Sequence, residues 1–273
     1  MDIRAVFDRV SLLDPAPDSF SLLIKGKRGN LFSLLSTPGG KGPHPAVILS
    51  HGYPGNEQNM DLMQFLRALG FAVLTYHYSG SWGSDGEFSF CNCIEDANTV
   101  LNYLIRHAAA YDVDPAHIYA VGHSMGGFVT THLLAGRKEL RGGVLIAPWD
   151  VARTYALSKT DGECRRNLSE VLSGGYGWLR GVTPEKFESE LSRDTDALRL
   201  DKLSPQLRNI PILCISAEND IVTPPELHQL PLRDALTDSE AFRYITLPGD
   251  HCFQAYRPPL WEAVGEYLLE LEK

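Results

Sequence analysis

Short runs of apolar residues alternate along this chain with longer segments in which apolar residues recur every three or four positions. The short runs predict buried strands, and the longer segments predict amphipathic helices, because these spacings match the periods of the two structures. The predicted strands are residues 46–50, 71–77, 118–122, 143–147, 212–216 and 242–247. The predicted helices are residues 56–69, 94–107, 125–134, 226–236 and 259–271. This order indicates the α/β class, with a mostly parallel sheet covered by helices on both faces.

Two segments depart from the alternation. Residues 19–24 and 31–36 flank a polar turn, so they predict an antiparallel hairpin that extends the sheet at one edge to about eight strands. Residues 151–207 are polar, rich in Gly, Ser and charge, and contain only weakly helical pieces such as residues 184–191. We interpret this segment as a small inserted cap. The alternative is a solvated excursion with no part in substrate choice.

The composition favours one soluble domain. The chain has 273 residues, of which 44% are hydrophobic and 22% charged, and no long stretch rich in Pro, Gly and Ser divides it. We therefore expect a single domain over residues 1–273, with the cap at about 151–207. The net charge of −9 argues against nucleic acid or an anionic membrane as the main partner. No apolar run approaches the roughly 20 residues that span a bilayer.

The N-terminal residues and the cysteines indicate in which cellular compartment the protein is expected. Asp2 stands where a secretory signal peptide would be basic and then apolar, so we expect a cytoplasmic protein. The five cysteines are an odd number without C-x-x-C spacing, which argues against a disulfide framework. Cys91 and Cys93 form a C-x-C, but no second His or Cys cluster completes a set of four ligands. We expect no metal and no cofactor.

The strongest local motif is G-x-S-x-G, which runs from Gly122 through Ser124 to Gly126. It directly follows a predicted strand and directly opens a predicted helix, which is the context that a nucleophilic serine requires. A side chain at either glycine would crowd the neighbouring backbone of so tight a turn. The turn also places Ser124 at a helix N-terminus, where unpaired N–H groups favour developing negative charge.

A serine nucleophile needs a base, and the base needs an orienting carboxylate. His251 lies in the turn after the last predicted strand, and Asp220 lies in the turn after the strand before it. Side chains at the C-terminal ends of parallel strands gather at one edge of a sheet, so these residues predict a Ser, Asp, His order along the chain. Other carboxylates stay open as the acid, namely Asp150, Glu218 and Asp250.

With these residues in place, the chain resembles the α/β-hydrolase superfamily from about Ser19 to Leu271. The resemblance rests on His51-Gly52-Tyr53-Pro54-Gly55, the Ser124 turn, Asn219-Asp220 and Asp250-His251. It implies the α/β-hydrolase fold and a catalytic triad of Ser124, Asp220 and His251. It also implies an oxyanion hole formed by the backbone N–H groups of Tyr53 and Met125, with His51 tying the early loop rather than acting as the base.

The loop of residues 78–88 resembles that of peptidase-like and feruloyl-esterase-like members of this superfamily. Trp82 and Phe88 could line an acyl pocket there, or they could be core residues of a well-packed loop. The resemblance implies a serine hydrolase acting on a small or medium carboxylic ester. Alternatives are a peptidase related to prolyl oligopeptidase and acylaminoacyl peptidase, an acyl thioesterase, a cofactor-free haloperoxidase or lyase, and a non-catalytic binding scaffold. The oligomeric state is not predicted.

Overall fold

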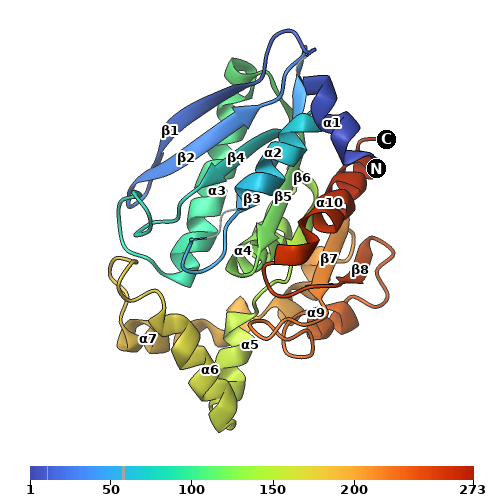
Figure 1. Cartoon of the computed structure of the whole chain (residues 1–273). Coiled ribbons are helices and arrows are strands. Elements are labelled where there is room, and N and C mark those ends of the chain that lie inside the picture. Colours follow the sequence, from blue (N-terminus) through green and yellow to red (C-terminus); the bar gives the residue numbers. More distant parts are fainter. Residues whose placement is uncertain (11, 57–58) are drawn as a thin grey trace.

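The computed structural model describes residues 1–10, 12–56 and 59–273 (Figure 1). Its centre is a sheet in the order β1-β2-β4-β3-β5-β6-β7-β8. The strands are β1 (Asp18–Gly26), β2 (Gly29–Thr37), β3 (His44–Ser50), β4 (Ala72–Tyr76), β5 (Val113–His123), β6 (Leu140–Ile146), β7 (Ile212–Ala217) and β8 (Phe242–Leu247). From β4 to β8 neighbouring strands are parallel, whereas β1 pairs antiparallel with β2 and β2 pairs antiparallel with β4.

The sheet confirms the strand predictions. The hairpin of β1 and β2 extends the parallel strands at one edge, as the polar turn between them predicts. Every residue of β4 and of β7 is buried, which explains why these strands read as continuous apolar runs. The largest difference is at β5, which begins at Val113 rather than residue 118, because Val113 already pairs with His44 of β3 before a register irregularity.

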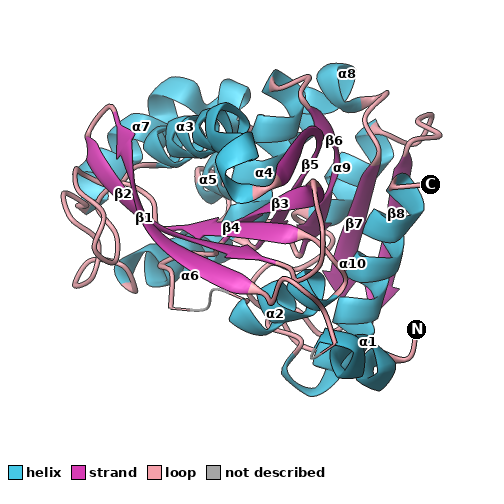
Figure 2. Ribbon diagram, turned by 90° about the horizontal axis from the view of Figure 1, so that it is seen from above, coloured by secondary structure: helices cyan, strands magenta, loops and turns pink. Residues whose placement is uncertain are grey.

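Helices cover both faces of the sheet (Figure 2). One core cluster combines buried side chains of the sheet with Val100 and Leu104 of α3 (Phe90–His107) and Phe128 of α4 (Met125–Gly136). The other combines the opposite face with Phe65 of α2 (Met60–Ala68) and Val264 of α10 (Arg257–Leu271). Packing on two faces gives the sheet the layered architecture that the alternating sequence predicts.

The predicted helices are present with shifted ends. Helix α2 begins at Met60 rather than residue 56, although residues 57 and 58 lie outside the described part of the chain. Helix α9 spans Gln229–Ala235, and the short α1 (Ile3–Val10) was not predicted, because its eight residues bury a single side chain. The 3₁₀ turns are η1 (Ala108–Tyr111), η2 (Leu200–Leu203) and η3 (Gln254–Tyr256).

The expectation of only weak helices in residues 151–207 is wrong. The segment contains α5 (Val151–Ser158), α6 (Gly162–Ser173), α7 (Pro184–Leu198) and α8 (Ser204–Leu207). Apolar periodicity misses α6 because it buries only Leu168 and Leu172. A side-chain cap marks its start instead, since Asp161 accepts the backbone N–H groups of Glu163 and Cys164.

Helices α5, α6 and α7 lie together beyond one end of the sheet, on the side where β6 leads into α5 (Figure 1). We call residues 151–207 the cap segment. In the described part of the chain, none of the helices has the length and apolar character needed to cross a bilayer.

Candidate active site

Ser124 occupies the turn between strand β5 and helix α4. Its backbone has φ 58° and ψ −121°, a strained conformation for a residue with a side chain. Backbone hydrogen bonds hold it there: its N–H donates to the Ile146 carbonyl at 2.8 Å, and its own carbonyl accepts the Trp149 N–H at 3.0 Å. The structure therefore has the strand, sharp turn and helix that the G-x-S-x-G motif predicts.

The two glycines of the motif are required by close backbone approaches. A Cβ at Gly122 would lie 2.0 Å from the carbonyl oxygen of Gly126, and a Cβ at Gly126 would lie 2.0 Å from that of Ser50. Neither contact involves a flexible side chain that could move away. The turn that carries Ser124 can form only because both flanking residues lack a side chain.

Asp220 and His251 form a hydrogen-bonded pair. Oδ2 of Asp220 lies 2.8 Å from Nδ1 of His251, and Oδ1 accepts the backbone N–H groups of Val222 and Thr223 at 2.9 and 2.7 Å. Burial alone would favour the protonated carboxyl, but the hydrogen bond and charge of His251 and the bonds from Thr223 outweigh it and lower the pKa of Asp220 to about 2.

This pair fixes the tautomer of His251. Asp220 is ionised at neutral pH, so its oxygens can only accept and the Nδ1 of His251 must carry the proton. In the neutral imidazole the lone pair then belongs to Nε2. A histidine in this state is ready to take a proton at Nε2, as a general base does.

The rival carboxylates are engaged elsewhere. Asp150 is buried and caps α5: Oδ1 accepts the Arg153 N–H at 2.9 Å and Oδ2 the Leu200 N–H at 3.0 Å. Burial raises the pKa of Asp150 to about 7. Asp250 accepts the N–H of Gln254 at 3.1 Å, and Glu218 is exposed. Of the four candidates, the structure brings Asp220 to His251.

His123, the residue before Ser124, links the serine turn to the loop of His251. Its Nε2 lies 2.8 Å from the His251 carbonyl oxygen, and its Nδ1 lies 3.4 Å from Nδ2 of Asn59. A carbonyl can only accept, so Nε2 carries the proton. Burial lowers the pKa of His123 to about 3, so this arrangement persists at neutral pH. The backbones of residues 124 and 251 are thereby held together by one buried side chain.

Arg257 completes this support, which sequence reasoning missed. Its guanidinium donates to Oδ1 of Asn59 at 2.9 Å, to the Cys252 carbonyl at 3.1 Å, and to both carboxylate oxygens of Asp61. Asp61 and Arg257 lie 196 residues apart, and no local motif relates them. Only the folded sheet brings the starts of α2 and α10 together beside His251.

The loop of residues 51–55 lies against the nucleophile. The Cβ position of Gly52 is 3.2 Å from Cβ and 3.6 Å from Oγ of Ser124. His51 is buried, which lowers its pKa to about 3, and its Nδ1 lies 2.7 Å from the Gly52 carbonyl oxygen. Tyr53 therefore follows a residue in contact with Ser124. Met125 is the first residue of α4, so its N–H has no partner within the helix.

The side chain of Tyr53 joins this loop to the cap segment. Its hydroxyl donates to the carbonyl of Leu172 in α6 at 2.6 Å, and its ring lies 6.0 Å from that of Trp149 and 5.7 Å from that of Phe88. Burial raises the pKa of Tyr53 above its ordinary value, so the hydroxyl keeps the proton that it donates. The cap segment is thus tied to the loop that contacts Ser124.

Trp82 and Phe88 occupy different surroundings. Phe88 is buried and its ring contacts those of Tyr53 and Phe90 at 5.7 and 5.9 Å. Trp82 donates from Nε1 to the Pro54 carbonyl at 2.8 Å and stacks on the exposed Trp178, with ring centroids 5.6 Å apart. Both border the loop of residues 51–55, and their contact with substrate stays a prediction.

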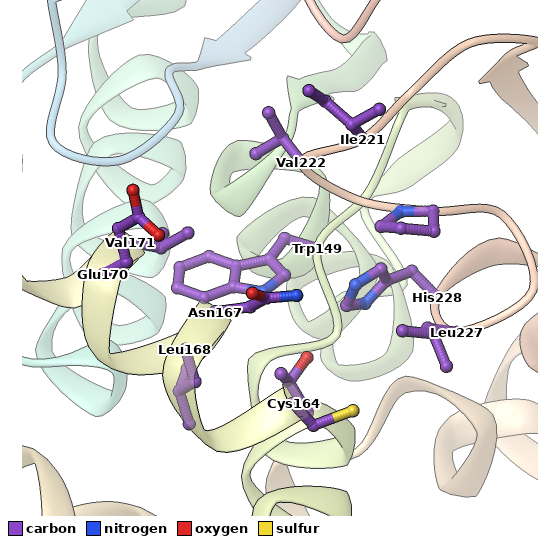
Figure 3. Close-up of a pocket in the computed structure, with 12 residues that line it drawn as sticks. Trp149, Cys164, Asn167, Leu168, Glu170, Val171, Ile221, Val222, Leu227 and His228 are labelled. Atoms are coloured by element: carbon purple, nitrogen blue, oxygen red, sulfur yellow. The ribbon is translucent and has the colours of Figure 1, made fainter. Parts of the chain in front are cut away.

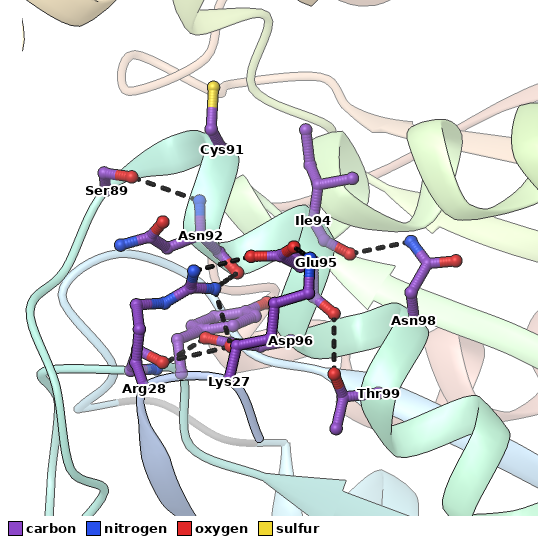
Figure 4. Close-up of polar contacts among 12 residues, drawn as sticks. Lys27, Arg28, Ser89, Cys91, Asn92, Ile94, Glu95, Asp96, Asn98 and Thr99 are labelled. Atoms are coloured by element: carbon purple, nitrogen blue, oxygen red, sulfur yellow. Dashed lines mark hydrogen bonds and ion pairs between the residues drawn. The ribbon is translucent and has the colours of Figure 1, made fainter.

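A network of charged residues positions the loop that carries Trp82 (Figure 4). Asp96 of α3 accepts the N–H and the hydroxyl of Ser79 at 2.7 and 3.0 Å. Arg28, from the β1–β2 turn, bonds to Asp96 at 3.2 Å and to Glu95 at 2.5 Å. Burial raises the pKa of Asp96, and the Arg28 charge opposes that rise. The hairpin turn therefore helps to fix the start of the 78–88 loop on α3.

A cavity of about 320 Å³ opens between α6 and the loop that follows Asp220 (Figure 3). Most of its wall is apolar, from Trp149, Leu168, Val171, Val222 and Leu227. Such a volume and lining are typical of a site for a small organic group. Trp82 and Phe88 do not line it.

A comparison with models of protein families identifies the family of this chain. A model of the alpha/beta hydrolase family matches residues 47–266, which include Ser124, Asp220 and His251. The chain belongs to the alpha/beta hydrolase family. The resemblance and the fold class predicted from the sequence are therefore confirmed.

One curated relative of this alpha/beta hydrolase matches most of the chain. An uncharacterised protein of Mycobacterium tuberculosis is 29% identical over 216 residues, which are 78% of this chain and 64% of that protein. The chain thus spans about two thirds of the length of this curated relative.

Two solved structures share the fold. The esterase Pf2001 of Pyrococcus furiosus has a TM-score of 0.68 at 17% identity, covering 93% of this chain and 92% of the esterase. A puromycin-hydrolyzing peptidase of Mycobacterium tuberculosis has a TM-score of 0.66 at 18% identity, covering 94% of this chain and 39% of the peptidase.

Proposed function

We propose that this protein is a serine hydrolase that cleaves small or medium carboxylic esters through an acyl-enzyme. The observation that carries the proposal is the Asp220–His251 pair at 2.8 Å, whose loop is tied by His123 to the turn of Ser124. An ionised carboxylate, an oriented imidazole and a serine at a strained turn are the groups that nucleophilic catalysis by a serine uses, which supports the proposal.

In the proposed mechanism, Ser124 attacks the ester carbonyl carbon while Nε2 of His251 takes the hydroxyl proton. The charge on the carbonyl oxygen is stabilised by the backbone N–H groups of Tyr53 and Met125. His251 then returns the proton to the leaving alcohol, the C–O bond breaks, and the acyl group stays on Ser124. Water attacks this ester with His251 again as base, releasing the acid and restoring the serine.

The choice of an ester rests on the cavity, since likeness to the esterase and to the peptidase at this identity reflects the fold alone. Among the described residues that line the cavity, Glu170 is the one acidic side chain, and no Lys or Arg is present. A coenzyme A thioester would bring several negative charges, for which basic side chains are expected. An uncharged organic ester suits the apolar wall better.

Replacing the nucleophile tests the proposal. Ser124→Ala should lower kcat on any ester that the wild type cleaves by about four orders of magnitude, because the residues of a triad act as a unit. The matched control is Ser192→Ala, an exposed serine of α7, which should leave kcat unchanged. Hydrolysis by Ser124→Ala at the wild-type rate would refute the assignment.

Chemical labelling tests the same residue without a known substrate. A fluorophosphonate should modify Ser124, as located by mass spectrometry of the digested protein, and Asp220→Asn should slow the labelling. A panel of 4-nitrophenyl esters, aminoacyl anilides and acyl thioesters, compared by kcat/KM, then separates the ester from the peptidase and thioesterase alternatives. A labelled enzyme that prefers anilides would favour the peptidase.

A further inference from the structure

His228 is a buried histidine that the proposed mechanism does not use. It directly precedes α9, eight residues after Asp220, and only 2% of its surface is exposed. Its Nδ1 accepts the backbone N–H of Asp150 at 3.2 Å. A backbone amide can only donate, so Nδ1 holds the lone pair and the proton of the neutral ring must be on Nε2. Burial lowers the pKa of His228 to about 3, so the ring is neutral at neutral pH.

The Nε2–H group of His228 faces the cavity. The imidazole forms part of the cavity wall, across from Asn167 of α6 (Figure 3). Within the described chain, no hydrogen bond runs from this nitrogen to a protein acceptor, and the atom is not among the fully enclosed ones that lack a partner, so it is open to the cavity. An apolar ligand group that fills the cavity displaces the water that this donor can bind, so an acceptor carried by the ligand restores the lost hydrogen bond.

Ser124, Asp220 and His251 do not line the cavity, but two residues of its wall are hydrogen-bonded to Ser124 and Asp220. The N–H of Trp149 donates to the Ser124 carbonyl at 3.0 Å, and the N–H of Val222 donates to Oδ1 of Asp220 at 2.9 Å. Ile221 and Val222, which also line the cavity, are 90% and 43% exposed. Large aliphatic side chains at the mouth of an apolar cavity suit the apolar part of a substrate held at Ser124.

We infer that this cavity binds the apolar part of the ester and that Nε2–H of His228 donates a hydrogen bond to an uncharged oxygen on it, such as a ketone, ether or hydroxyl oxygen. This inference rests on the proposed function. The substrate class becomes a carboxylic ester with a short apolar chain or ring that carries one oxygen acceptor. His228 is then a specificity residue, because an all-carbon analogue would leave its N–H unpaired.

The expected size of this selectivity follows from the unpaired donor. Sites built to bond a substrate oxygen discriminate against analogues without it, since the buried polar group then loses its partner. For a neutral donor, we expect about a tenfold preference in kcat/KM for the oxygen-bearing ester.

The test compares matched esters in the wild type and in two variants. The substrates are 4-nitrophenyl hexanoate with its 4-oxo and 5-oxo analogues, and hexyl acetate with the same ketones on the alcohol side. His228→Leu removes the donor, whereas His228→Gln can accept the Asp150 N–H with Oε1 and donate with Nε2. For each pair, the kcat/KM of the ketone is divided by that of its parent ester. Comparing this preference between the wild type and a variant cancels the intrinsic reactivity of the esters.

We expect at least one ketone to be favoured about tenfold over its parent by the wild type and by His228→Gln, but not by His228→Leu. Equal preferences in the wild type and His228→Leu for every pair would overturn the inference. Fluorophosphonate labelling of Ser124 in all three proteins keeps the two proposals apart. A labelled enzyme without oxygen selectivity refutes the role of His228 alone, whereas loss of labelling in the wild type refutes the serine hydrolase.

A measurement on the wild type covers the case in which His228→Leu fails to fold. Nitrogen-15 NMR of histidine-labelled protein should show His228 protonated at Nε2 and bare at Nδ1. Its Nε2–H signal should shift when a 5-oxohexyl fluorophosphonate reacts with Ser124, and not with the hexyl reagent. The opposite tautomer, or equal shifts with both reagents, would overturn the inference.

Discussion

Lowering the pH from 7.0 to 5.5 should destabilise this protein through its buried histidines. Burial lowers the pKa of His51, His123 and His228 to about 3 and that of His132 to about 4. In the unfolded chain each would titrate near its ordinary value of about 6.5. The unfolded state therefore binds more protons as the pH falls through this window, and stability is lost from about pH 6.5 downward.

The magnitude follows from the two sets of pKa values. Between pH 7.0 and pH 5.5, protonation of the unfolded chain costs the folded state a little over ~1 kcal/mol per histidine, so the four together lose about 5 kcal/mol. Asp150 acts in the opposite direction. Its pKa is raised to about 7, so the folded state takes up its proton first and gains about 2 kcal/mol over the same range. A net loss of about 3 kcal/mol remains.

Urea unfolding at the two pH values and equal ionic strength measures this loss as a change in the free energy of unfolding. The matched control is His132→Gln, which lies outside the candidate active site and can still donate to the Leu198 carbonyl. It should reduce the loss by about 1 kcal/mol, because one titrating group has gone. A wild-type free energy that changes by less than 1 kcal/mol between the two pH values would refute the reasoning.

Two further predictions concern the scaffold of the site. Gly126→Ala should lower the free energy of unfolding by more than about 3 kcal/mol, since its Cβ would lie 2.0 Å from the Ser50 carbonyl oxygen. In thermal unfolding, Gly136→Ala at the end of the same helix, with open space around its Cβ, should cost nothing. Arg257→Lys keeps a positive charge beside Asp61 but loses the hydrogen bond to the Cys252 carbonyl. Because that bond helps to position the loop of His251, kcat should fall about tenfold while KM stays unchanged. A changed KM with normal kcat would contradict this positioning role.

Much of the sheet could be predicted because its central strands are buried on both faces. Strands such as β4 and β7 are continuous apolar runs, and the turns between them are marked by Gly, Pro and Asn. The cap helices could not be found in this way, since α6 buries only Leu168 and Leu172. Its start is instead encoded by Asp161, a cap whose effect is local and leaves no apolar period.

The candidate site also has residues that the sequence predicts and residues that it does not. The serine turn is a local motif, and Asp220 and His251 each follow a strand, so their meeting at one edge of the sheet follows from parallel topology. Asn59 and Arg257 support the same loop, but Asn59 directly precedes α2 and Arg257 begins α10, far along the chain. Nothing in their own neighbourhoods predicts that contact, because it depends on how α2 and α10 pack on one face.

Under the proposed function, catalysis and substrate choice both depend on the segment between strand β7 and helix α9. Asp220 orients His251, and Thr223 stabilises that carboxylate with its N–H and its hydroxyl. Ile221 and Val222, which follow Asp220 in the same turn, line the cavity together with His228. A substrate group that packs on these side chains therefore contacts the backbone that holds the catalytic acid. Under the proposed mechanism, a well-fitting ester would raise kcat as well as lower KM, since its binding energy would fix the residues that act in the transition state.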